Sequence, residues 1–94
     1  MTKEELVAKI AARSGLTQVA SEKAINAMIF EIITHVSHGG KLTLKNFGSF
    51  SRRLHKSRIS RVLGTGRTVV VPESFKVYFR PGKDFKYWVK KNGE

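Results

Sequence analysis

The sequence contains no cysteine and no long apolar run. Without cysteine the chain forms neither disulfides nor thiolate metal sites, and this composition fits a reducing compartment. No apolar stretch approaches the ~18 residues that a membrane-spanning helix requires. The first ten residues, MTKEELVAKI, are charged and lack the apolar region of a signal peptide. We therefore expect an intracellular protein outside the membrane, located in the cytoplasm.

Acidic residues are missing from the middle of the chain. The 94 residues include 18 Lys and Arg but only 7 Asp and Glu, which gives a net charge of +11. Residues 1–40 are balanced, whereas residues 41–94 carry the whole excess, and no acid occurs between Glu31 and Glu73. Such an asymmetry indicates a polyanionic partner, most often nucleic acid and sometimes an anionic membrane surface.

The residue types needed for catalysis do not occur in suitable combinations. Asp84 is the only aspartate, and Glu31 and Glu73 fall in different predicted elements, so these acids do not form a close carboxylate pair for acid–base chemistry. His35 and His38 lie three residues apart, but they lack the third ligand that a zinc site requires. The Gly-Thr-Gly sequence at 64–66 does not precede a helix, so it is not a phosphate-binding loop. We predict no enzyme activity, metal, cofactor or small-molecule substrate.

Apolar periodicity predicts two N-terminal helices. Thr2 and Glu5 have capping-box spacing before a helix that ends at Ser14, and Thr17 caps a second helix that runs to about Ser37. The apolar residues of the second helix cover more than one face, and a surface this wide needs more than one neighbouring element. Because the chain is short, we predict a homodimer whose core includes Ile25, Ile29, Ile32 and Val36.

After Gly40 the apolar period changes from 3.6 to 2 and predicts strands. Extended runs cover residues 42–44, continue from Ser49, and recur at 68–71 and 75–80. Phe75, Val77 and Phe79 alternate onto one face, which favours a core position. Pro81-Gly82 ends the last strand, and a short helix is predicted from Lys83. This order of elements is α+β, with two helices, a three-stranded sheet and a terminal helix.

Residues 51–67, SRRLHKSRISRVLGTGR, combine a high positive charge with a turn signal. The Gly-Thr-Gly sequence permits a tight hairpin, so we predict a β-ribbon arm with its tip at residues 61–66. Its basic side chains are suited to a phosphate backbone, although a hairpin whose charges only prevent edge aggregation is the alternative. The six basic residues are Arg52, Arg53, Lys56, Arg58, Arg61 and Arg67.

Val62 and Leu63 form an apolar pair at the predicted arm tip, where no core covers them. An apolar side chain inserted between base steps unstacks them and kinks the duplex. We predict that these two residues form such a wedge, with Leu63 in the leading position. The alternative is that the pair packs across the ribbon.

Three segments resemble the HU/integration host factor family of bacterial DNA-bending proteins: MTKEELVAKIA at the start, NFGSF at 46–50 and FRPGKDFK at 79–86. The resemblance covers essentially the whole chain. It implies an intertwined dimer with a saddle of strands above the helices, from which two arms wrap the minor groove. The same resemblance leaves a heterodimer with a paralogue as the alternative to the predicted homodimer.

The resemblance also assigns residues. Family members usually carry Arg-Asn-Pro at the arm tip, and Leu63 stands at the position of that proline. Phe47, Phe50 and Phe79 match core positions, and Arg53, Arg58 and Arg61 match arm arginines. Lys83 and Lys86 match the flanking DNA contacts of the family, and we expect further contacts at Lys3 and Arg80.

The sequence thus predicts one DNA-binding domain over 1–94, with a helical dimerisation region at 1–40, the sheet and arm at 41–82 and a C-terminal helix at 83–94. The expected function is a nucleoid-associated protein that bends double-stranded DNA with low sequence specificity. The alternatives are a site-specific subunit of the integration host factor type and, in another class, a basic RNA-binding module. Membrane-surface binding is less favoured because the basic segment is not an amphipathic helix.

Overall fold

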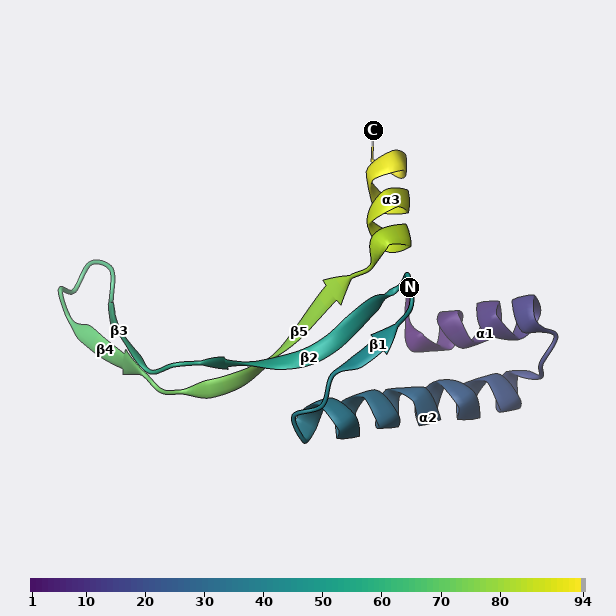
Figure 1. Cartoon of the computed structure of the whole chain (residues 1–94), viewed down its shortest axis with the longest axis horizontal. Helices are drawn as coiled ribbons and strands as arrows, with labels where there is room; N and C mark the ends of the chain where they lie inside the picture. Colours follow the sequence, from purple (N-terminus) through teal and green to yellow (C-terminus); the bar gives the residue numbers. More distant parts are fainter. Residues whose placement is uncertain (94) are drawn as a thin grey trace. The chain divides into compact units, whose positions relative to one another are not determined.

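The computed structural model describes residues 1–93, so the last position of the predicted 83–94 helix lies outside the described residues. The chain divides into two compact units, Met1–Thr34 and a second unit that begins at His35. Figure 1 shows the elements in chain order, and the predicted α+β order is confirmed. They are α1 Lys3–Ser14, α2 Gln18–Ser37, β1 Leu42–Leu44, β2 Gly48–His55, β3 Arg58–Arg61, β4 Thr68–Val71, β5 Ser74–Pro81 and α3 Lys83–Asn92.

The first unit is a helical hairpin of α1 and most of α2 (Figure 1). Thr2 begins α1, because its Oγ1 accepts a hydrogen bond from the Glu5 amide at 3.4 Å. Thr17 begins α2 in the same way, accepting from the Ala20 amide at 3.1 Å. The buried side chains of this unit are few: Val7, Ala11, Ser21 and Ile25.

Much of the apolar surface of α2 remains uncovered in the single chain. Met28, Phe30 and Ile33 are 52%, 65% and 60% exposed. Of the four α2 residues predicted for a dimer core, Ile25 and Val36 are buried, Ile32 is half-buried and Ile29 is 38% exposed. An apolar surface of this kind in a protein is typical of an interface.

The second unit contains an antiparallel sheet with strand order β1-β2-β5 and a separate two-stranded ladder of β3 and β4. The long hairpin of β2 and β5 pairs Gly48 with Pro81 at one end and His55 with Ser74 at the other. The second ladder pairs Arg58 with Val71. Between the two ladders the chain advances three residues on one side, from His55 to Arg58, and three on the other, from Val71 to Ser74. The interruption at Pro72 therefore breaks the pairing without shifting the register.

Four phenylalanines pack where the sheet meets α3. The Phe79 ring lies 4.8 Å from Phe50, 5.6 Å from Phe47 and 5.9 Å from Phe85, measured between centroids. The start of α3 is held by the turn after β1, because the Gly82 amide donates to the Phe47 carbonyl at 2.8 Å. Phe50 and Phe79 are half-buried while Phe47 is 44% exposed, so this cluster is a partial core in the single chain. Among residues 1–93 no helix is long and apolar enough to cross a membrane.

Candidate nucleic-acid interface

The β2–β5 hairpin has two chemically different faces. Side chains alternate along a strand, and residues paired across an antiparallel ladder project to the same side. The register therefore places eight polar side chains on one face, which we call the cationic face: Ser49, Ser51, Arg53, His55, Ser74, Lys76, Tyr78 and Arg80. The opposite, apolar face carries Phe50, Leu54, Phe75, Val77 and Phe79, with Arg52 among them.

The cationic face contains no acidic side chain, and its charges come from Arg53, Lys76 and Arg80. Arg53 is held in place on it, because its Cζ lies 3.5 Å from the centroid of the Tyr78 ring. Tyr78 is the diagonal neighbour of Arg53 across the ladder, which is within reach of long and aromatic side chains. A stacked guanidinium keeps its edge N–H groups available for a phosphate.

The sequence predicts that Phe75, Val77 and Phe79 share one face and lie in the core; the shared face is confirmed, whereas burial in a core is not. Phe75, Val77 and Phe79 share the apolar face, as their alternation predicts. Phe75 and Val77 are nevertheless 55% and 78% exposed, so the single chain does not bury them.

The interruption of the hairpin forms a small groove of about 310 Å³ with cationic walls. Pro72 lacks an amide N–H, so the pair that it would form with Ser57 cannot be closed by two hydrogen bonds. The groove is lined on its charged side by Lys56, Arg58 and Lys76, together with His55. Lys56, a predicted DNA contact, is thereby brought next to two further cations.

Beyond the interruption, β3 and β4 form the outer arm. Arg58 pairs with Val71 and Arg61 pairs with Thr68, so the two arginines lie on opposite faces of the ladder. Both are exposed, as are Arg67 and the other predicted basic contacts of the arm. An arm with cations on both faces suits a narrow groove whose walls are both lined by phosphates.

The arm ends in a closed turn. The Val62 amide donates to the Arg67 carbonyl at 2.8 Å, and Thr65 Oγ1 accepts from the Arg67 amide at 3.2 Å. Gly64 and Gly66 have φ values of +83° and +72°, which the Gly-Thr-Gly sequence accommodates. Leu63 is 96% exposed at this turn, whereas Val62 is 39% exposed. The tip therefore presents one fully uncovered aliphatic side chain.

A second cationic groove, of about 580 Å³, lies between the end of β5 and α3. Its charged lining consists of Arg80 from β5 and three lysines of α3, namely Lys83, Lys86 and Lys90, with the Tyr87 ring alongside. The predicted contacts Arg80, Lys83 and Lys86 are thus brought together in one place.

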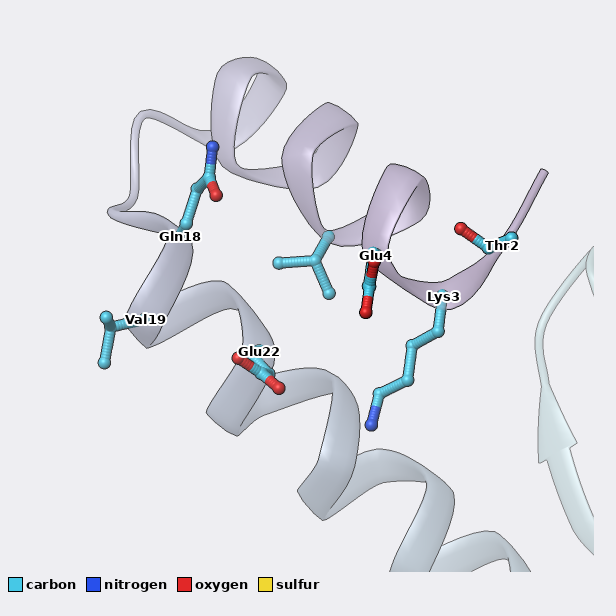
Figure 2. A pocket seen from close by; sticks show the side chains of 7 residues that line it. Thr2, Lys3, Glu4, Gln18, Val19 and Glu22 are labelled. Carbon is cyan, nitrogen blue, oxygen red and sulfur yellow. The ribbon is translucent and has the colours of Figure 1, made fainter.

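Lys3 belongs to a different environment. It lines a groove of about 570 Å³ between α1 and α2 together with Glu4 and Glu22 (Figure 2). Two carboxylates beside one ammonium make this groove less favourable for a phosphate than the two grooves of the second unit.

A profile of the Bacterial DNA-binding protein family matches residues 1–90. The chain is 36% identical to the DNA-binding protein HU of Xylella fastidiosa over 90 residues, which cover 96% of each chain. It is 34% identical to integration host factor subunit beta of Paraburkholderia phytofirmans over 87 residues, which cover 92% of this chain and 81% of the relative.

Solved structures agree with these relatives. The structure of Anabaena HU crystallised with DNA superposes with a TM-score of 0.87 at 35% identity and covers 95% of this chain and 97% of the other. The chain belongs to the HU/integration host factor family. It is a DNA-binding architectural protein and not an enzyme. The predictions of DNA binding and of no enzyme activity are therefore confirmed.

For this HU/integration host factor protein, the sequence prediction missed three cationic-surface residues. Lys76 lies on the cationic face, and Tyr87 and Lys90 line the groove at α3. Alternation along 74–81 carries the signal for Lys76, since it stands in phase with Tyr78 and Arg80. Helical spacing gives the signal for Lys90, which follows Lys83 and Lys86 at intervals of three and four.

Proposed function

We propose that a dimer of this chain binds double-stranded DNA in the minor groove with low sequence specificity, and that its two arms kink the duplex. The proposal rests chiefly on one observation, a 96% exposed Leu63 at the tip of an arm with arginines on both faces. Such an arm brings an apolar wedge to the base stack while its cations contact phosphates. A protein of this kind would be located in the cytoplasmic nucleoid.

The uncovered apolar surface supports the dimer. Only four apolar side chains of residues 1–93 are buried, namely Val7, Ala11, Ile25 and Val36. A folded domain this small needs most of its apolar side chains in a core or against a partner. The exposed apolar residues of α2 and of the apolar sheet face are the surfaces that a second copy would cover. A paralogue could do the same in a heterodimer.

The stacking arrangement disfavours an RNA-binding module. Single-strand binders offer open aromatic rings to the bases. Here the Arg53 guanidinium occupies one face of the Tyr78 ring at 3.5 Å, and the Arg52 guanidinium occupies one face of the Phe75 ring at 3.9 Å. The hairpin therefore lacks two of the open ring faces that base stacking requires.

The deciding experiment compares the affinity for an intact duplex with the affinity for the same duplex carrying a nick or a short gap, at one fixed salt concentration. Distorted DNA has already lost part of its stacking, so a kinking protein binds it at least about tenfold tighter, given an unstacking cost of a few kcal/mol. Equal affinity would leave a DNA-coating protein and would contradict the kinking mechanism.

Sequence tolerance needs its own measurement, because relatives of both the HU and the integration host factor types match this chain. Minor-groove readout is degenerate, so we expect affinities for unrelated duplexes of equal length to agree within about tenfold. A single sequence bound roughly 10³-fold tighter than the rest would instead favour the site-specific alternative.

A further inference from the structure

Arg52 occupies an unexpected position for a basic residue of a DNA-binding arm. The register pairs it with Val77, between Phe50 and Leu54 on its own strand, so it lies on the apolar face. Its neighbour Arg53 lies on the cationic face. The two adjacent arginines therefore project to opposite sides of the same hairpin, and only Arg53 shares a face with Lys76 and Arg80.

The Arg52 guanidinium is held by two partners from different elements. Nη1 donates a hydrogen bond to the Ser37 carbonyl at 3.2 Å, and Cζ lies 3.9 Å from the centroid of the Phe75 ring. Ser37 is the last residue of α2, and Phe75 belongs to β5. One side chain from β2 thus connects the helix end to β2 and β5 just beyond Phe50, where the pairing of β2 with β1 ends. We call this part of the hairpin the root of the arm.

The carbonyl groups at the end of α2 favour a cation at this position. The final carbonyls of a helix lack intrahelical partners and carry partial negative charge. The Val36 carbonyl accepts from the Gly39 amide at 3.0 Å, and the His35 carbonyl accepts from the Gly40 amide at 2.9 Å. Arg52 supplies the donor for the next carbonyl, that of Ser37, and so completes the cap.

Gly39 makes room for the guanidinium. Its φ is +92°, and a Cβ at this position would lie 3.1 Å from Arg52 Nη2 and 3.5 Å from Nε. A side chain there would therefore be disfavoured by the backbone conformation and by crowding against Arg52. Gly39, two residues after the end of α2, thus leaves the space that the Arg52 guanidinium occupies.

We propose that Arg52 is a positioning residue and not a DNA contact: it clamps the last turn of α2 to the root of the arm and thereby fixes the direction in which the arm leaves the sheet. This inference rests on the proposed function, because the direction of the arm matters only if the arm grips DNA. It also separates two residues that the sequence alone assigns the same role.

The test uses three variants of the full-length protein: Arg52→Gln, Arg52→Lys and, as the matched control, Arg53→Gln. The two glutamine variants remove the same charge from adjacent positions. Arg52→Lys keeps the charge but loses the planar group that stacks on Phe75 while donating to Ser37. Amide hydrogen exchange is measured on the free protein, and the dependence of DNA affinity on salt is measured on the complex.

In the free protein we expect both Arg52 variants to accelerate exchange at Gly39, Gly40 and the neighbouring β5 amides by about tenfold or more, with Arg53→Gln unchanged there. In the complex, Arg53→Gln lowers the slope of log K against log salt by about 0.9 for each phosphate that the protein no longer neutralises, whereas Arg52→Gln leaves the slope unchanged. Both Arg52 variants reduce the bend measured by energy transfer between the duplex ends.

Two results would overturn the clamp: unchanged exchange in both Arg52 variants, or a salt slope that falls in Arg52→Gln as it does in Arg53→Gln. The bend measured with the unmodified protein tests the proposed function separately from the clamp. If the unmodified protein does not bend DNA, the exchange rates of the free protein still decide whether Arg52 holds the helix end to the arm.

Discussion

At the scale of single residues, Leu63 is the side chain on which the kinking mechanism depends. Replacing it with alanine removes three carbons, and each buried methylene is worth about 0.8 kcal/mol. If Leu63 inserts into the base stack, Leu63→Ala weakens the bent complex by roughly 2 kcal/mol for each arm, or about 10³-fold for the two arms of a dimer together, and reduces the bend. The salt slope stays the same, since no charge changes. Titrations at several salt concentrations, with energy transfer reporting the bend, measure both quantities.

The control for Leu63 is Ile59→Ala, which truncates a 74% exposed aliphatic residue of β3 away from the tip. Equal losses of affinity and bend in the two variants would show that apolar contact along the arm matters and that insertion at the tip does not.

Ser21 allows a second prediction at this scale, concerning stability. It is fully buried in the helical unit, and its Oγ has no hydrogen-bond partner among the described residues. An unpaired buried hydroxyl costs about 1–3 kcal/mol, and alanine also favours a helix. Ser21→Ala should therefore raise the urea midpoint of unfolding without changing the slope m. The control variant Ser14→Ala should lower the urea midpoint, because Ser14 Oγ donates a hydrogen bond to the Ile10 carbonyl at 2.7 Å. A lowered midpoint in Ser21→Ala would contradict the prediction.

At the scale of elements, the outer arm should carry much of the salt dependence of DNA binding. The double variant Arg58→Gln/Arg61→Gln removes four cations from a dimer. If each touches one phosphate, the slope of log K against log salt falls by about 3 to 4. The charge-matched control is Lys9→Gln/Arg13→Gln in α1, outside the predicted site, for which we expect a change below about one unit. Similar changes in both double variants would indicate that net charge, and not the arm, sets the slope.

The elements themselves could be predicted from the sequence, because their signals are local. The capping threonines, the change of period after Gly40 and the Gly-Thr-Gly turn each act within a few residues. The different surroundings of Arg52 and Arg53 depend on strand pairing and on a contact with Ser37, fifteen residues away. A count of basic residues treats both as DNA contacts, whereas the alternation of Arg52 with Phe50 and Leu54 already indicates the apolar face.

At the scale of the whole molecule, the core cannot be read from one chain. Phe75 and Val77 have the pattern of core residues, yet they are exposed, as are Met28, Phe30 and Ile33 of α2. In the dimer that we propose, a second chain would cover these side chains, and the apolar pattern of one chain does not say whether that chain is a copy or a paralogue. The identity of the partner is therefore a matter for measurement.

We expect a homodimer of two 10.6 kDa chains in solution, because the exposed apolar surface of α2 needs a partner. Ile33, 60% exposed, is the residue to change. In Ile33→Glu a charge would be buried at the interface, so sedimentation equilibrium should show a shift to monomer and unfolding at lower temperature. Ile59→Glu introduces the same charge at a 74% exposed position of the arm and should remain dimeric.

For the unmodified protein, the melting temperature should rise with protein concentration, since association stabilises only the folded state. A melting temperature independent of concentration, together with a monomeric mass, would exclude the dimer on which the two-armed grip depends.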